Sequence, residues 1–325
     1  MGLLALALAS LFAALAGTAS ANTITVGSVL PPVASSEKVE EVKTFFNTAL
    51  PEKGASLASP VSGVVVRWRL LGAKGGPFTL RILRPNGLGA YTAVGTSSPA
   101  TPSGTGLQTF SANVPIKSGD LLAVDPTNPT DELGFATEAG AAFSTIFPSP
   151  FEGATVPARV PVSGKEIELS AEVQPTPSLK AISASVGPVT GGTEVKITGA
   201  DFTGASAVKF GTVPAATFKV ESDSEIVVTA PKSAKVGNVD VTVTTLAGTS
   251  AVVREGRFTY RGCVVPKLAG KKLGKVKSLL KSGNCKLGKV TLRGDATRRT
   301  GKVKQQAPKP KKVLAPGAKV KITLG

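Results

Sequence analysis

The chain has 325 residues, with 38 Lys and Arg, 21 Asp and Glu, no His and a formal net charge of +17. The absence of His excludes Ser-His-Asp and Cys-His catalytic arrangements and removes the commonest ligand of transition metals. No Gly-rich phosphate loop of the Walker type occurs either. The composition therefore favours a binding protein without a cofactor over an enzyme.

The first segment has the pattern of a secretory signal peptide. Leu3 to Ala16 is almost entirely Leu, Ala and Phe, and this run is too short for a membrane-spanning helix of roughly 20 residues. The small residues Ala19-Ser20-Ala21 follow it, so we expect a signal peptide over residues 1–21 and cleavage before Asn22. No Lys or Arg precedes the apolar run, and a buried core helix is the alternative. No later segment is apolar enough to anchor the chain, so we expect a secreted, extracellular, wall-associated protein without a transmembrane segment.

Residues 22–173 contain short strands separated by turns. Two runs alternate with period two between an apolar and a charged side, and the charged positions are Arg67 and Arg69 in residues 64–70 and Glu166, Glu168 and Glu172 in residues 166–173. This alternation is typical of strands with one buried face. We therefore expect a jelly-roll-like β-sandwich over 22–173, with these acids at its surface and Trp68 in its core. Pairing of the two strands would place Arg67 beside Glu168.

Two other stretches of this region carry specific expectations. The mostly polar residues 36–48 are the best place for a short helix or for a cover over a strand edge.

One loop concentrates oxygen ligands that a calcium ion prefers, and its candidate residues are Asp125, Asn128, Asp131 and Glu132. The alternative for this loop is a turn whose Asx side chains bond their own backbone. We predict no other metal site.

Residues 174–178 read as a Pro-rich linker, and residues 179–260 resemble an IPT/TIG domain. The matching features, in chain order, are Gly187-Pro188, Gly191-Gly192, Gly199, Asp201-Phe202, Phe210-Gly211, Ala230-Pro231 and Phe258-Thr259-Tyr260. The resemblance implies an immunoglobulin-like sandwich that serves as a spacer and orients its neighbours. Val195 and Ile197 are expected to point into its core.

The basic excess of the chain lies in its last segment. Between Arg261 and Gly325 there are 19 Lys and Arg and one acid, Asp295, which is a net of +18, whereas the first 260 residues have a net of −1. Both cysteines, Cys263 and Cys285, also lie here. An even, minimal Cys count in a secreted chain predicts one disulfide. Two thiolates without His and with one nearby acid do not make a zinc site.

Residues 263–325 resemble a PASTA domain, a small α+β module of penicillin-binding proteins and bacterial serine/threonine kinases. The resemblance is carried by Val265-Pro266-Lys267-Leu268-Ala269-Gly270, an amphipathic run over 272–282, Gly283, strand-like runs at 287–292 and 302–306, and Pro316-Gly317. Two features depart from the family: the step Gln306-Ala307-Pro308 replaces a direct Gln-Pro or Ser-Pro, and the Cys pair is additional. Some members of the family bind wall fragments, so the resemblance implies a wall-binding module.

The expected partner of this segment is an anionic wall polymer or peptidoglycan. The predicted anion-binding residues are Lys271, Lys272, Lys275, Lys277, Lys281, Lys286, Lys289, Arg293, Arg298, Arg299, Lys302 and Lys304. A solvated Lys-rich face without a ligand is the alternative. Lys predominates over Arg and aromatics are absent, which disfavours base stacking and therefore nucleic acid.

The sequence as a whole predicts a mainly β, non-catalytic binding or adhesion protein of a bacterial envelope. The 22–173 sandwich is expected to face a carbohydrate, and the basic segment is expected to anchor the chain. The alternatives are a surface-polysaccharide enzyme whose catalytic unit is the 22–173 sandwich, and a purely structural spacer. Inward acids clustered in a solvent-open groove would favour the enzyme.

Overall fold

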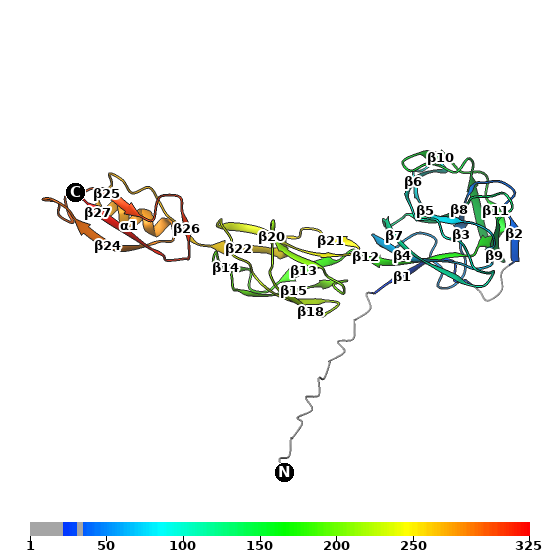
Figure 1. The fold of residues 1–325 in the computed structure, drawn as a ribbon, viewed down its shortest axis with the longest axis horizontal. Coiled ribbons are helices and arrows are strands. Elements are labelled where there is room, and N and C mark those ends of the chain that lie inside the picture. The colour runs from blue at the N-terminus through cyan, green and yellow to red at the C-terminus, as the bar shows by residue number, and fades with distance from the viewer. Residues whose placement is uncertain (1–21, 31–34) are drawn as a thin grey trace, which may run out of the picture.

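The computed structural model describes residues 22–30 and 35–325. The predicted signal peptide, residues 1–21, lies outside the described residues. Three β-rich units follow one another in a row (Figure 1), and each has its own cluster of buried apolar side chains. The mainly β-sandwich fold that the alternation predicts is confirmed. In the part of the chain that is described, no helix is long and apolar enough to cross a membrane.

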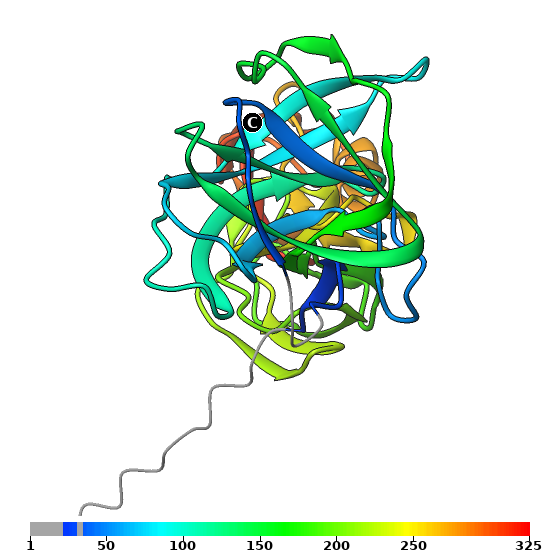
Figure 2. The same ribbon diagram turned by 90° about the vertical axis from the view of Figure 1, so that its right-hand side faces the viewer.

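The first sandwich comprises residues 22–175, and Figure 2 shows it from its outer end. Its strands are β1 (Ile24–Gly27), β2 (Ser35–Lys38), β3 (Thr44–Ala49), β4 (Gly63–Leu70), β5 (Phe78–Pro85), β6 (Ala90–Thr96), β7 (Gln108–Ile116), β8 (Leu121–Pro126), β9 (Glu132–Ile146), β10 (Thr155–Pro157), β11 (Val162–Ile167) and β12 (Leu169–Pro175). One sheet has the order β1-β12-β4-β7, and the other has the order β10-β6-β5-β8-β3-β9-β11 with β2 paired to β9. Trp68 is fully buried in the main core, where its ring centroid lies 4.7 Å from that of Phe110.

The helix or edge cover expected in residues 36–48 is wrong. This stretch forms β2 and most of β3, and β3 lies inside the larger sheet between β8 and β9. Phe45 belongs to the main core, whereas its neighbour Phe46 belongs to a second apolar cluster of the same unit. Successive side chains of a strand point to opposite faces, so two consecutive Phe residues mark a strand that is buried on both sides.

The predicted pairing of residues 64–70 with residues 166–173 is confirmed, since β12 pairs antiparallel with β4. The ionic partner is nevertheless different from the expected one. Arg67 lies opposite Glu172 in the register, and its Nε donates a hydrogen bond of 2.8 Å to Glu172 Oε2. Arg69 also forms a salt bridge with Glu172. Glu168 is fully buried elsewhere, so the proposed pair of Arg67 with Glu168 is wrong.

The middle unit comprises residues 178–261 and is a two-sheet sandwich. Its elements are β13 (Ser178–Ile182), β14 (Val186–Pro188), β15 (Glu194–Ala200), β16 (Ala207–Phe210), β17 (Val213–Pro214), β18 (Phe218–Ser222), β19 (Glu225–Thr229), β20 (Gly237–Thr245), β21 (Gly248–Thr249), the 3-10 turn η1 (Arg254–Gly256) and β22 (Arg257–Arg261). The sheet orders are β13-β15-β19-β18 and β14-β22-β20-β16-β17, with β21 on β20. Val195 and Ile197 are fully buried as expected, and Phe210 packs edge-on against Phe258 with centroids 5.2 Å apart.

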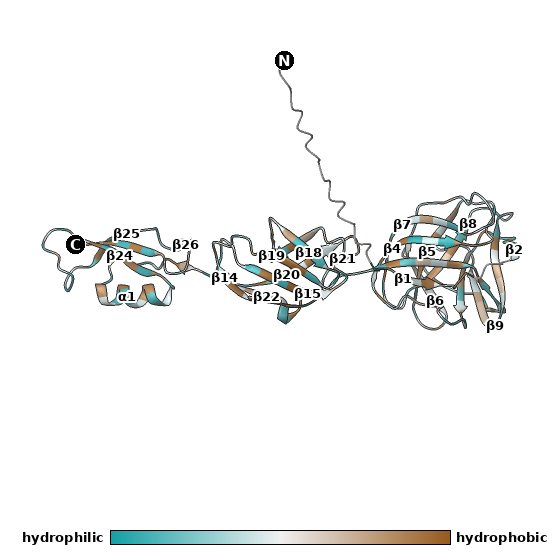
Figure 3. Cartoon of the chain, turned by 90° about the horizontal axis from the view of Figure 1, so that it is seen from below, coloured by the Kyte–Doolittle hydropathy of each residue, from teal (hydrophilic) through white to brown (hydrophobic). Residues whose placement is uncertain are grey.

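The tip unit comprises residues 263–325. Its elements are β23 (Cys263–Val264), α1 (Leu273–Ser282), β24 (Lys286–Leu292), β25 (Val303–Ala307), β26 (Val313–Leu314) and β27 (Lys319–Leu324). A three-stranded sheet has the order β24-β27-β25, and β23 pairs with β26. Helix α1 lies on one side of the sheet (Figure 3), because Val276 and Leu280 pack against apolar residues of β25 and β27.

The connections between the units are short. β12 ends at Pro175 and β13 begins at Ser178, so only two residues of the expected 174–178 linker lie outside strands. One of these two, Thr176, bonds both neighbours: its N–H donates to Ser62 O at 2.9 Å, and its hydroxyl donates to Ala247 O at 3.1 Å. Between the middle unit and the tip unit only Gly262 lies outside strands.

Candidate anion-binding surface

The tip unit presents its charge to solvent without internal compensation. All twelve predicted anion-binding side chains belong to exposed residues. Among the described residues, no salt bridge involves a side chain beyond Arg257, and the acid Asp295 is itself exposed. Like charges on a small unit repel one another and attract a polyanion over about 8–10 Å at ordinary salt. The cationic surface is therefore available to an external anion.

The end of α1 determines how the lysines of the helix and those of β24 come to lie on neighbouring elements. Gly283 closes the helix, and a Cβ there would lie 2.6 Å from the Val264 carbonyl oxygen, which explains why no larger residue fits. The left-handed turn falls on the next residue, Asn284, with a φ of 55°. The Cys285 N–H then donates to Leu280 O at 2.8 Å. This turn brings the chain from the helix into β24.

A disulfide joins Cys263 to Cys285, as the sequence predicts. It ties β23 to the residue that precedes β24, and both cysteines are buried in the small core of the tip unit. The bond closes a loop with a sequence separation of 22 residues. By the loop-entropy relation such a loop stabilises the fold by about 3 kcal/mol.

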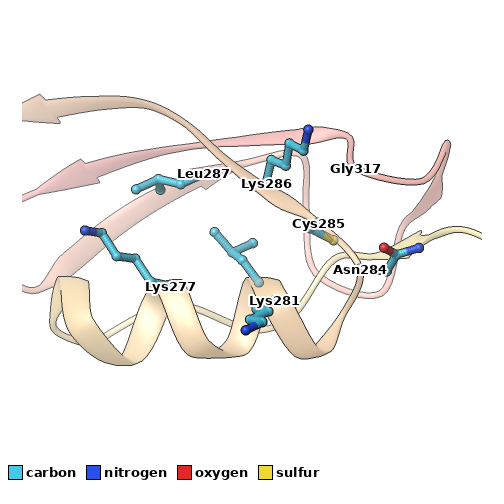
Figure 4. Close-up of a pocket in the computed structure, with 8 residues that line it drawn as sticks. Lys277, Lys281, Asn284, Cys285, Lys286, Leu287 and Gly317 are labelled. Carbon is cyan, nitrogen blue, oxygen red and sulfur yellow. The ribbon is translucent and has the colours of Figure 1, made fainter.

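A hollow of about 410 Å³ lies between α1 and β24 (Figure 4). Its lining residues are Lys277, Leu280, Lys281, Asn284, Cys285, Lys286, Leu287 and Gly317. The lysines at 277 and 281 come from successive turns of α1, and the third comes from the start of β24. This hollow brings together three of the predicted anion-binding residues.

The remaining predicted residues lie around the rest of the unit. Lys289 belongs to β24, whereas Arg293, Arg298 and Arg299 lie in the loop between β24 and β25. In this loop the Thr297 and Thr300 hydroxyl oxygens are 2.8 Å apart. The predicted set thus surrounds the tip unit and does not converge on a single point.

Gln306, which the sequence singled out as a departure from the family, has a structural role. Its Oε1 accepts a hydrogen bond of 2.8 Å from the Leu268 N–H, and its Nε2 donates one of 3.0 Å to Pro266 O. The side chain thereby fastens the opening segment of the unit to β25.

We expect Gln306→Leu to destabilise the tip unit by about 1–3 kcal/mol, because it leaves the Leu268 N–H without its partner. Hydrogen exchange of peptides from residues 264–325 in the full chain measures the effect. Gln305→Leu, at an exposed neighbouring position, is the matched control. Equal exchange in the two variants contradicts the expectation.

The candidate calcium residues hold the first sandwich together and do not converge. Asp125 is buried, and it accepts hydrogen bonds of 2.6 Å from Arg81 Nε and from the Thr44 hydroxyl. Asp131 is buried as well, and three backbone N–H groups, those of Gly76, Thr127 and Asn128, donate to it at 2.8–3.0 Å. Glu132 lies near Lys74, at 3.9 Å. Within residues 22–30 and 35–325, no three acidic or Cys side chains are arranged to hold a metal ion.

The expectation that Glu166 and Glu168 lie at the surface is wrong. They are 1% and 0% exposed, and the Ser28 Oγ lies 2.7 Å from Glu166 Oε1 and 3.2 Å from Glu168 Oε2. One oxygen of each carboxyl, and Oε2 of Glu52, is buried without a hydrogen-bond partner. Burial, together with the nearby Glu52, raises the pKa of Glu166 to about 8 and the pKa of Glu168 to about 7.

The local geometry explains why sequence reasoning missed this cluster. β11 belongs to the larger sheet and β12 to the smaller one, with Glu168 alone between them. Asn47 clamps the crossing: its Oδ1 accepts from the Ile167 N–H at 2.7 Å, and its Nδ2 donates to Ile167 O at 2.9 Å. Alternation identifies two faces of a strand, but it does not reveal that both become covered where a strand changes sheets.

Comparison with known proteins gives matches to the two C-terminal units. The family model described as IPT/TIG domain matches residues 177–260, and that described as PASTA domain matches residues 264–325. No curated protein matches the chain in sequence.

Comparison with solved structures gives matches of low overall similarity, including the following two. The gamma-CGTase from Alkalophilic bacillus clarkii is 15% identical, with 66% of this chain and 25% of that chain covered and a TM-score of 0.23. The full extracellular region of plexin A4 is 14% identical, with 71% of this chain and 34% of that chain covered and a TM-score of 0.24. The chain thus spans about a quarter and about a third of the length of these structures.

The two family matches coincide in position with the middle unit and with the tip unit. Residues 177–260 are an IPT/TIG domain and residues 264–325 are a PASTA domain, a combination that fits a protein of the cell envelope.

Proposed function

We propose that the protein is a secreted, non-catalytic envelope protein, which its PASTA domain retains at the wall by electrostatic attraction to an anionic polymer or to peptidoglycan. The observation that carries this proposal is the uncompensated charge of the tip unit. Its cationic side chains are exposed and form no salt bridge among the described residues. The lysines of the other two units, in contrast, include several with acidic partners, such as Lys165, Lys196 and Lys219.

Three observations support a non-catalytic role. The sequence has no His, and both cysteines are held in a disulfide. The inward acids Glu166 and Glu168 are closed to solvent, whereas glycoside hydrolysis needs two carboxyls with access to water and to the sugar. The disulfide also supports an oxidising, extracellular compartment. The carbohydrate partner of the first sandwich stays a prediction.

The test is sedimentation of the mature full chain with isolated bacterial wall material across a salt series. We expect the bound fraction to fall at least about tenfold between about 0.1 M and about 1 M salt, since the Debye length shrinks from about 10 Å to about 3 Å. The triple variant Lys277→Gln, Lys281→Gln, Lys286→Gln is expected to bind more weakly at low salt.

The matched control removes the same charge from the other units, as Lys165→Gln, Lys196→Gln, Lys219→Gln. It is expected to bind as the unaltered chain does. Binding that resists salt, or an equal loss in both triple variants, contradicts retention through the tip unit.

Amino-terminal sequencing of the exported chain, with Asn22 expected first, tests secretion.

A further inference from the structure

The tip unit has a second hollow, on the face of its sheet that α1 leaves uncovered. Val320, Ile322 and Leu324 of β27 are buried under the helix. Residues that alternate with them on the strand therefore point to the opposite side. A hollow of about 430 Å³ lies on this side, lined chiefly by Lys289, Thr291, Gln305, Ala307, Lys321 and Thr323. All three strands contribute to it.

A row of uncharged hydrogen-bonding groups crosses this face. Thr323 on β27 lies opposite Thr291 on β24 and opposite Gln305 on β25 in the sheet register. Neighbouring strands are about 4.8 Å apart, so two hydroxyls and one amide follow one another across the sheet. Each of these groups both donates and accepts hydrogen bonds. They suit a ligand that carries hydroxyl groups at short intervals.

Two ammonium groups flank this row. Lys321 is two residues before Thr323 on β27, and Lys289 is two residues before Thr291 on β24. The register of the two strands shifts between Leu287 and Val290, and such bulges redirect side chains. A Cβ at Gly288 in this shift would lie only 3.2 Å from the Val320 backbone. The bulge thus sets Lys289 beside the row, and no acid lines the hollow.

The residue types on this face limit further the chemical class of ligand that it can bind. Residues 263–325 contain no aromatic side chain, so neither a sugar ring nor a base can stack on this unit. The cations of this face are lysines, which bind phosphate as point charges, and no Arg lines the hollow for two-point recognition of a carboxylate or a phosphate. The hollow beside α1, in contrast, has lysines, Leu side chains and the amide of Asn284 but no hydroxyl. Of the two hollows of the tip unit, the one on the uncovered sheet face alone combines cations with both hydroxyl and amide groups.

We propose that this sheet face binds a polymer of phosphate-linked polyols, whose phosphates contact Lys289 and Lys321 and whose hydroxyls bond Thr291, Thr323 and Gln305. The inference rests on the proposed electrostatic retention and deepens it, because it assigns the recognition to one face and to one polymer class. The lysines of α1 then add attraction without selectivity.

The test uses the full mature chain and three probes. Poly(glycerol phosphate) supplies phosphates and hydroxyls, inorganic polyphosphate supplies phosphates alone, and polygalacturonate supplies carboxylates and hydroxyls. Dissociation constants are measured by calorimetry at constant ionic strength. We expect poly(glycerol phosphate) to bind at least about tenfold more tightly than polygalacturonate at equal charge.

Two sets of variants separate local recognition from diffuse attraction. Thr291→Val with Thr323→Val leaves the charge unchanged and is expected to weaken poly(glycerol phosphate) about tenfold, while polyphosphate binding stays the same. Lys289→Gln with Lys321→Gln is expected to weaken it more than the charge-matched Lys277→Gln with Lys281→Gln. Circular dichroism of each variant confirms that the fold is retained.

The outcomes distinguish recognition by this sheet face from the proposed electrostatic retention of the chain through the tip unit. Equal losses in the two lysine pairs, with no loss in the threonine pair, overturn the assigned face but leave electrostatic retention standing. Equal or tighter binding of polygalacturonate overturns the phosphate class. Failure of the unaltered chain to bind any of the three polyanions or wall material overturns both.

Discussion

The first sandwich is expected to lose stability as the pH rises from about 5 to about 8. Burial gives Glu166 a pKa of about 8 and Glu168 a pKa of about 7, against an ordinary value of 4.5. Both carboxyls therefore hold protons in the folded unit that they release in the unfolded chain. Their contribution to stability is complete below pH 4.5 and is lost as the pH passes through their folded values.

The size of this effect follows from the number of protons that only the folded unit holds. Each such proton costs about 1.4 kcal/mol of stability per pH unit within the window. For a unit of this size, 1 kcal/mol shifts the melting temperature by about 2–4 °C. We therefore expect the melting temperature to fall by more than about 10 °C between pH 5 and pH 8. Trp68 is the only Trp in the chain and is buried in this unit, so its fluorescence follows the melting of the first sandwich selectively.

Substitution of the buried acids identifies the source of the pH dependence. Glu166→Gln with Glu168→Gln keeps both positions uncharged and is expected to flatten the change of melting temperature with pH. Glu138→Gln, at an exposed position of the same unit, is the control and is expected to leave it unchanged. A steep dependence that persists in the buried double variant refutes this explanation.

Removal of the disulfide is expected to unfold the tip unit selectively. A domain of about 60 residues buries too little surface to have much stability to spare, and the Cys263–Cys285 bond contributes about 3 kcal/mol of it. Cys263→Ala with Cys285→Ala should therefore leave this unit largely unfolded near its former melting temperature. The first sandwich and the middle unit contain neither cysteine and should melt as before.

Limited trypsin digestion measures this effect, because the tip unit is rich in Lys and Arg. We expect the variant to lose the segment after Arg261 rapidly, while a fragment that contains the first sandwich and the middle unit persists. Reduction of the unaltered chain should reproduce the result. If the variant resists trypsin as well as the oxidised chain does, the small core supports the unit without the bond.

Features with short-range signals could be predicted from the sequence. The apolar positions Val276 and Leu280, followed by Gly283, predict the helix of the tip unit and its end, and α1 forms within one residue of the expected bounds. The strands of the middle unit follow the Gly and Pro turns in the same way. The disulfide followed from counting alone, because only two cysteines were present to pair.

Features that depend on long-range contacts could not be predicted in this way. Ser28 and Glu166 are 138 residues apart in sequence, yet their side chains are hydrogen-bonded. Likewise, nothing local to Phe46 indicates that a second apolar cluster covers its face of β3. On the tip unit, the anion-binding residues predicted from the sequence included Lys289 but not Lys321. The prediction did not include Thr291 or Thr323 either. The sheet register that brings these residues together pairs β24 with β27, and residues 293–318 separate these two strands in the sequence.

One residue, Gly262, connects the middle unit to the tip unit, and two residues, Thr176 and Pro177, connect the first sandwich to the middle unit. Connections this short limit how far neighbouring units can move apart. A Cβ at Gly262 would lie 2.9 Å from side-chain atoms of Val189 and from the Leu314 carbonyl oxygen, so residues of both units pack closely against the backbone at this joint. If the tip unit is anchored to the wall as proposed, these short connections keep the first sandwich at a nearly constant distance from the wall. Under the proposed anchoring, a binding site on the first sandwich would meet only targets that lie near this distance from the wall.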